Sequence, residues 1–122
     1  GMERTFDRFD KVAQRCAQLM PQLPEQYRCF FLDNLSAPCH YMAALSHSLY
    51  HFLRAYKYTE KRTKNLDLSI EYLEKAQEAL YSTQHGVFTD WYAGDKLHGK
   101  FNIPAKLKLL HKLCDKYCEK QM

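Results

Sequence analysis

A stretch over residues 87–103 holds the residues of this sequence best suited to binding chemistry. It contains the only tryptophan of the chain, together with neighbouring carboxylates and a lysine. An aromatic ring can stack on the apolar face of a sugar while carboxylates accept hydrogen bonds from its hydroxyl groups. The candidate ligand-binding residues, with a glycan as the expected ligand, are Asp90, Trp91, Tyr92, Asp95 and Lys96.

Two other interpretations of this stretch are open. Asp90 and Asp95 could form a glycosidase pair, but a small helical chain offers little material for a shaped cleft, so we assign no catalytic residue. Alternatively, Trp91 and Tyr92 close the end of a helical bundle, and Asp90 caps a helix or pairs with a lysine. Most helix–helix connections are only a few residues long, so this long aromatic loop is expected to do more than connect.

A second group of residues could bind a metal. His47 and His51 are one helical turn apart, and His111, Cys114 and Cys118 share one face of a later segment. If the two segments faced each other, these side chains could supply the four nitrogen and sulfur ligands of a zinc site. The histidine pair lacks the glutamate of a zinc-protease helix, because a serine follows the first histidine. We therefore predict no metal and no other cofactor, and keep these five residues as weak candidates.

The composition indicates one globular domain over residues 1–122, with 46% hydrophobic and 26% charged residues. Whether this domain was excised from a larger protein is left open by the sequence. No apolar run approaches the roughly 18 residues of a membrane span. The net charge is +4, and lysines recur every four residues from Lys108 to Lys120. This stripe contains no arginine, the residue favoured for bidentate phosphate recognition, so we interpret it as a solvated face. Neither nucleic acid nor a membrane is an expected partner.

The five cysteines have an odd count and irregular spacing, which is not typical of a disulfide framework. Most of them fall on apolar faces, where a reduced cysteine behaves as a small hydrophobic residue. We therefore expect free thiols.

Helical periodicity defines the elements that position these residues. Apolar residues three and four apart predict a first helix from Phe6 to Leu23, closed by two prolines. A second pattern, from Tyr27 to Tyr56, stays in phase on both sides of Pro38. It predicts one long helix kinked near residues 36–38, with two helices broken at Ser36 as the alternative.

A polar turn is expected from Thr59 to Lys64, with Asn65 or Asp67 capping a third helix that ends before Gly86. Asn102 and the proline at position 104 are typical of the start of a fourth helix that runs almost to the C-terminus. Strand-like alternation is absent. The sequence predicts an all-α, up-and-down bundle of four to five helices with one long aromatic loop.

Two stretches together resemble a known family. One comprises residues 23–35 (LPEQYRCFFLDNL) and 38–42 (PCHYM), and the other comprises residues 88–96 (FTDWYAGDK). The pattern is similar to the helical C-terminal portion of bacterial glycoside hydrolases of the α-glucuronidase type, family 115 and its relatives. In those enzymes a proline followed by an arginine and two aromatics starts a long helix, and a later helix leads to an aromatic loop.

The resemblance implies a non-catalytic accessory domain, because the catalytic acids of such enzymes are expected in a preceding barrel domain. The partners would be that catalytic domain and, through the aromatic loop, a glycan. A homo-oligomer is also open. The location would be periplasmic or secreted, and otherwise cytoplasmic. The alternatives are a free-standing helical protein–protein interaction module and a metal-binding bundle.

Overall fold

The computed structural model describes residues 2–83 and 103–121, except for the side chains at positions 2, 5, 103 and 118–121. Every regular element in this part of the chain is helical, and no strand occurs in it. The elements are α1 (Met2–Leu19), η1 (Met20–Gln22), α2 (Glu25–Phe31), η2 (Leu32–Ser36), α3 (Ala37–Lys57), η3 (Thr59–Lys61), α4 (Arg62–Tyr81) and α6 (Ile103–Gln121).

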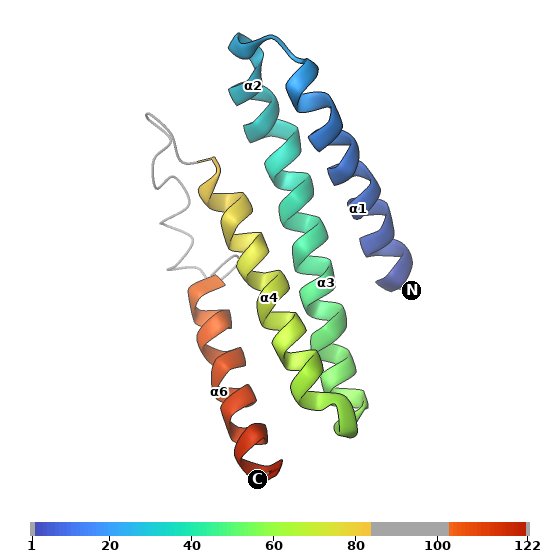
Figure 1. Cartoon of the computed structure of the whole chain (residues 1–122), viewed down its shortest axis with the longest axis vertical. Coiled ribbons are helices and arrows are strands. Elements are labelled where there is room, and N and C mark those ends of the chain that lie inside the picture. Colours follow the sequence, from blue (N-terminus) through green and yellow to red (C-terminus); the bar gives the residue numbers. More distant parts are fainter. Residues whose placement is uncertain (1, 84–102, 122) are drawn as a thin grey trace.

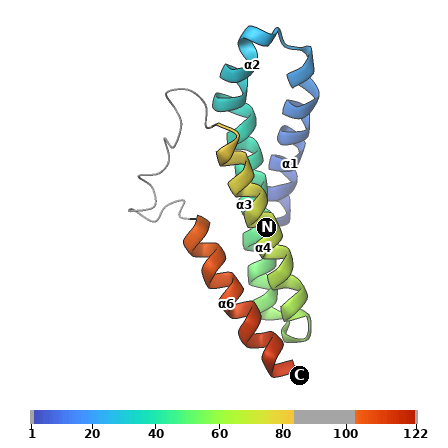
Figure 2. The same ribbon diagram turned by 60° about the vertical axis from the view of Figure 1, so that its left-hand side comes forward.

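The helices run up and down and pack in chain order. α1 packs on α3, α3 on α4, and α4 on α6 (Figures 1 and 2). The turn between α1 and α2 lies at one end of the molecule, and the turn between α3 and α4 lies at the other (Figure 1). The predicted all-α, up-and-down bundle is confirmed. The aromatic loop around Trp91 and the capping residues Gly86 and Asn102 lie outside the described residues.

The second helical pattern forms one continuous helical stretch from Glu25 to Lys57, so one long helix is confirmed over two helices broken at Ser36, and the kink stays a prediction. Its irregularity is the π-helical turn η2, which ends at Ser36, two residues before Pro38. Proline has no N–H group, and its ring clashes with the carbonyl four residues earlier. The chain widens by one residue per turn here, so that the N–H of Ala37 bonds the carbonyl of Leu32 five residues back. The stretch therefore passes the proline without ending.

Arg28 closes the corner between α1 and α2. α1 ends at Leu19, and Pro21 lies in the short η1 turn that follows. The Arg28 Nε donates to the carbonyl of Leu23 at 3.0 Å, and the Arg28 Nη2 donates to the carbonyl of Pro21 at 3.4 Å. These carbonyls have no helical partner at a helix end. The arginine that follows the proline in this sequence thus has a local structural role.

The start of α4 differs from the prediction. The turn after α3 ends at Lys61, and α4 begins at Arg62, so neither Asn65 nor Asp67 is its N-cap. Asn65 is buried inside the first turn, where its Nδ2 donates to the carbonyl of Lys61 at 3.1 Å. The Arg62 Nε donates to the carbonyl of Ala55 at 3.0 Å, which ties this first turn to the end of α3.

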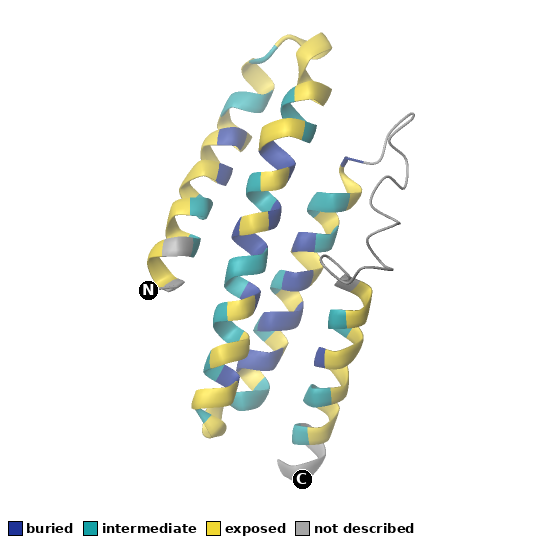
Figure 3. Ribbon diagram, turned by 180° about the vertical axis from the view of Figure 1, so that it is seen from behind, coloured by how far each residue is buried: buried dark blue, intermediate teal, exposed yellow. Residues whose placement is uncertain are grey.

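The main core lies between α3, α4 and α6. In Figure 3, buried positions on these helices face the neighbouring helices, and the outward faces are exposed. Small residues let α3 and α4 approach closely: the Ser48 Oγ donates to the Ser69 carbonyl, and the Ser69 Oγ donates to the Ser48 carbonyl, both at 2.8 Å. The buried residues of this core are Tyr41, Ala44, Ala55, Leu66, Ile70, Leu73, Ala76 and Leu110.

The inner face of α4 consists of the buried residues Leu66, Ile70, Leu73 and Ala76. Glu71 and Lys75 lie on its outer face and form an exposed i,i+4 ion pair. In the described part of the chain, no helix is both long enough and apolar enough to cross a membrane.

Candidate functional site

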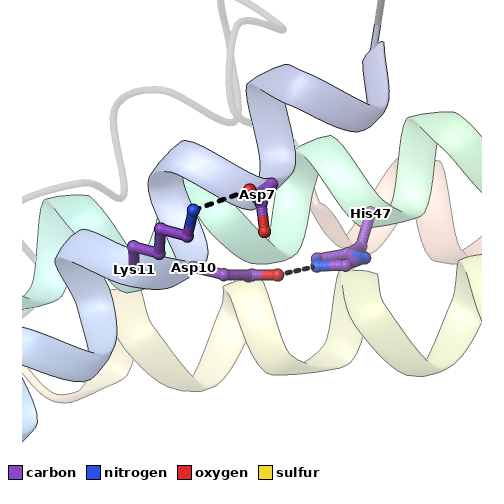
Figure 4. Close-up of polar contacts among 4 residues, drawn as sticks. All are labelled: Asp7, Asp10, Lys11 and His47. Carbon is purple, nitrogen blue, oxygen red and sulfur yellow. Dashed lines mark hydrogen bonds and ion pairs between the residues drawn. The ribbon is translucent and has the colours of Figure 1, made fainter.

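His47 lies at the junction of three helices. Its Nε2 is 2.7 Å from Asp10 Oδ2 on α1 (Figure 4). The imidazole lies between two aromatic rings, with centroid distances of 4.2 Å to Phe6 on α1 and 4.4 Å to Tyr72 on α4. Only 15% of the His47 side chain is exposed. Such a ring has little surface left for a substrate, and its contacts join α1, α3 and α4.

His51, one turn further along α3, has a similar structural setting. Its Nδ1 is 3.2 Å from the Asn65 Oδ1 on α4, and its ring stacks with Tyr72 at 5.6 Å. Because an amide oxygen only accepts, the imidazole donates from Nδ1. Asn65 therefore bridges the loop carbonyl of Lys61 and the His51 ring. The rings of His47 and His51 both stack with the Tyr72 ring, and these contacts pack α4 against α3.

The structure separates the described members of the predicted metal set. His47 and His51 face α1 and α4, whereas Cys114 on α6 donates from Sγ to Asp67 Oδ1 at 3.2 Å. His111 is exposed, and the side chain of Cys118 lies outside the description. Across the described ranges 2–83 and 103–121, no group of three or more His, Cys, Asp or Glu residues is placed to hold a metal ion.

A groove of about 630 Å³ runs beside His47, between α1 and α4, with α3 as its floor. Small residues such as Ala13 and Ala17 on α1 and Ala44 on α3 make up half of its lining. Most of the other lining residues are polar or charged, and they include Gln14, Lys75 and Glu78. On the floor, the His40 Nδ1 donates to the carbonyl of Ser36 at 2.8 Å. The groove therefore has a mixed lining of small and polar residues.

Three cysteines test the expected thiol chemistry. Cys16, Cys29 and Cys39 are free, and they are buried, exposed and half-buried respectively. Burial raises the pKa of the Cys39 thiol, and the neighbouring Cys16 raises it further. The exposed Cys29 departs from the expectation of a buried thiol, because α2 has no buried residue at all.

The most unusual surface of the described structure is an apolar face on the long helix. We call it the apolar seam, and it consists of Leu35, Met42, Leu49, Phe52, Leu53 and Tyr56, each at least 36% exposed. Tyr56 is 82% exposed, and Phe30 on α2, at 72%, continues the apolar exposure toward the other end of the helix. Three seam residues of α3, Met42, Leu49 and Tyr56, are seven residues apart and so share one face of the helix.

The seam is also free of formal charge. Residues 34–53 contain no lysine, arginine, aspartate or glutamate. A solvated helix face normally carries charged or polar residues opposite the core, as α4 does with Glu71, Glu74 and Lys75. Sequence periodicity placed these apolar residues on a helix correctly, but it did not show that the resulting face is left uncovered.

The predicted ligand-binding residues Asp90, Trp91, Tyr92, Asp95 and Lys96 lie outside the described residues, so their glycan contact stays a prediction. No protein-family model matches the chain, and neither a curated protein nor a solved structure shows significant similarity to it.

Proposed function

We propose that this chain is a non-catalytic helical accessory domain that docks against another protein and is associated with a polysaccharide-degrading glycoside hydrolase. The apolar seam is the observation that carries the docking role. Large apolar patches on a soluble protein mark interaction surfaces, and the seam residues Leu49 and Tyr56 are exposed by 50% and 82%. The resemblance of residues 23–42 and 88–96 to α-glucuronidase-type enzymes supplies the enzyme association.

The contacts of His47 support the non-catalytic part of the proposal. His47 and Asp10 have the spacing of an acid–base pair, but the imidazole is enclosed by Phe6 and Tyr72. A catalytic base needs to reach the proton that it removes from a substrate. Here the pair connects two helices instead. The glycan contact at Trp91 remains part of the proposal, carried by the residue types of that loop.

The enzyme association is tested by the coding region around this chain. A reading frame that continues into an α/β-barrel catalytic domain supports the accessory role. Deleting residues 1–122 from that enzyme is then expected to lower its activity on polymeric substrate or its stability, with activity on a small aryl glycoside as the control. A protein that begins at Met2, with no enzyme domain attached, contradicts the association and favours the free-standing interaction module.

The glycan contact is tested separately by titrating Trp91 fluorescence with acidic xylan-type oligosaccharides. Trp91 is the only tryptophan, so its emission reports on this loop alone. A saturable change that is absent with a neutral, unrelated oligosaccharide supports the contact. No change with any glycan contradicts it.

A further inference from the structure

We infer that the apolar seam binds a second copy of this chain, with the two long helices packed antiparallel about a two-fold axis. The inference rests on the proposed docking role and names the partner. Such a dimer would bring together two enzyme molecules, or two free-standing modules.

The area of the seam fits a stable dimer. A large side chain buries about 200 Å² when fully covered. The exposed fractions of the six seam residues therefore leave roughly 600 Å² of surface. Each partner of a stable protein interface contributes about 800 Å², of which about 65% is apolar in homodimers. The seam therefore supplies enough apolar surface for one side of such an interface.

The spacing of the seam favours a helix as its occupant. Leu35, Met42, Leu49 and Tyr56 recur every seven residues, and Phe52 falls between the last two. Leu45, which falls between Met42 and Leu49, packs against the core of its own chain. A seven-residue spacing is the one with which two helices interlock their side chains in a coiled coil. The face from Met42 to Tyr56 lies within the single helix α3, so it is long and regular enough for such packing.

A second copy matches this face because the seam is self-complementary under a two-fold axis. If the axis crosses α3 between Leu45 and Ser46, then Met42 lies opposite Leu49 of the second copy, and Leu35 lies opposite Tyr56 of the second copy. Each contact occurs twice, as a two-fold interface requires. The residues closest to the axis are uncharged, so no charge is desolvated at the centre of the interface.

The charged residues favour the antiparallel orientation. Lys57 is exposed near the C-terminal end of α3 and directly follows the seam residue Tyr56. A parallel pair would bring this cation close to its own copy, and like charges side by side are destabilising. In the antiparallel pair, the two basic ends lie at opposite ends of the interface.

Sedimentation equilibrium over a micromolar concentration series of the whole chain tests the inference. The unmodified chain is expected to reach the mass of a dimer. Leu49→Lys places a charge in the seam and is expected to raise the dimer dissociation constant at least about tenfold, and Leu49→Gln is expected to raise it less. Tyr81→Lys is the matched control, because Tyr81 is 48% exposed at the C-terminal end of α4 and is not a seam residue. This control is expected to dimerise like the unmodified chain.

A charge swap tests the orientation. Met42→Glu combined with Leu49→Lys in one chain places Glu opposite Lys in the antiparallel dimer. The double variant is therefore expected to dimerise more tightly than either single variant. In a parallel dimer the same variant would pair Glu with Glu and Lys with Lys, so weaker association than in both single variants would overturn the antiparallel arrangement. Circular dichroism confirms that each variant keeps its helical content.

Two results would overturn the second copy as partner: an unmodified chain that stays monomeric throughout the series, or a Leu49→Lys variant that dimerises as well as the unmodified chain. A monomer whose reading frame continues into a glycoside hydrolase leaves the proposed function standing, with the seam covered inside the parent enzyme. If the chain forms a dimer and no enzyme domain adjoins it, then the second copy is supported as the partner and the enzyme association fails.

Discussion

Replacing His47 by alanine should destabilise the fold more than any loss of its hydrogen bond alone. His47 stacks on Tyr72, packs against the tilted ring of Phe6 and contacts Asp10 at 2.7 Å. Each aromatic pair contributes about 0.5–1.5 kcal/mol beyond its buried area. The Asp10 side chain is 36% exposed. Its contact with His47 is therefore expected to contribute about as much to the free energy of unfolding as an ordinary hydrogen bond, about 1 kcal/mol. His47→Ala should therefore cost about 2–4 kcal/mol, and Asp10→Ala about 1 kcal/mol.

His47→Phe separates the two contributions, because phenylalanine keeps the stacking and removes the hydrogen bond. We expect its cost to match that of Asp10→Ala, about 1 kcal/mol. The assay is urea unfolding followed by far-ultraviolet circular dichroism, at one fixed protein concentration because dimerisation adds to apparent stability. If His47→Ala is no more destabilising than Asp10→Ala, then the stacking contributes nothing and the structural explanation of this cluster is wrong.

Three further predictions concern packing and thiol chemistry. Ser69→Val should cost at least about 2 kcal/mol in urea unfolding, because it overpacks the close approach of α3 and α4 and removes a hydrogen bond; a neutral effect would contradict that close approach. Leu73→Ala should cost about 2–5 kcal/mol, whereas Leu49→Ala should cost less than about 1 kcal/mol per folded chain at concentrations where the chain is monomeric; equal costs would mean that the seam belongs to the core. Because burial and a neighbouring thiol raise the pKa of Cys39, it holds less thiolate near pH 8 than an ordinary cysteine. Iodoacetamide should therefore label Cys29 first, as followed by peptide mass spectrometry, and Cys39 labelling should catch up only as the pH rises; faster labelling of Cys39 would contradict the raised pKa.

Local signals in the sequence predicted most of the helical architecture. The three- and four-residue spacing of apolar residues, and the prolines at positions 21 and 104, define helices whose ends depend on nearby residues only. The helix on both sides of Pro38 was predictable for the same reason. Its π-helical turn was not, because the number of residues in that turn depends on how the chain relieves the clash with the proline ring.

Contacts between residues that are far apart in the sequence account for the differences between the predicted and the observed structure. The sequence places His47 and His51 on one helix face, but nothing in their spacing indicates Asp10, 37 residues earlier, or Asn65 as their partners. The contact between His51 and Asn65 also explains why Asn65 does not cap α4. Its side chain is bonded to the His51 ring and to the carbonyl of Lys61. Periodicity likewise identifies an apolar face without showing whether another helix covers it, so the exposed seam at Leu49 could only be found in the structure.

The coverage of the apolar seam in solution is the central claim, and hydroxyl-radical footprinting measures it directly. Met42 and Tyr56 lie on the seam, whereas Tyr81, which is 48% exposed, lies at the end of α4 and serves as the internal reference. The claim predicts that oxidation of Met42 and Tyr56 falls relative to Tyr81 as protein concentration rises, and that Leu49→Lys abolishes this protection. Oxidation of both seam residues that keeps a constant ratio to Tyr81 at every concentration would contradict it.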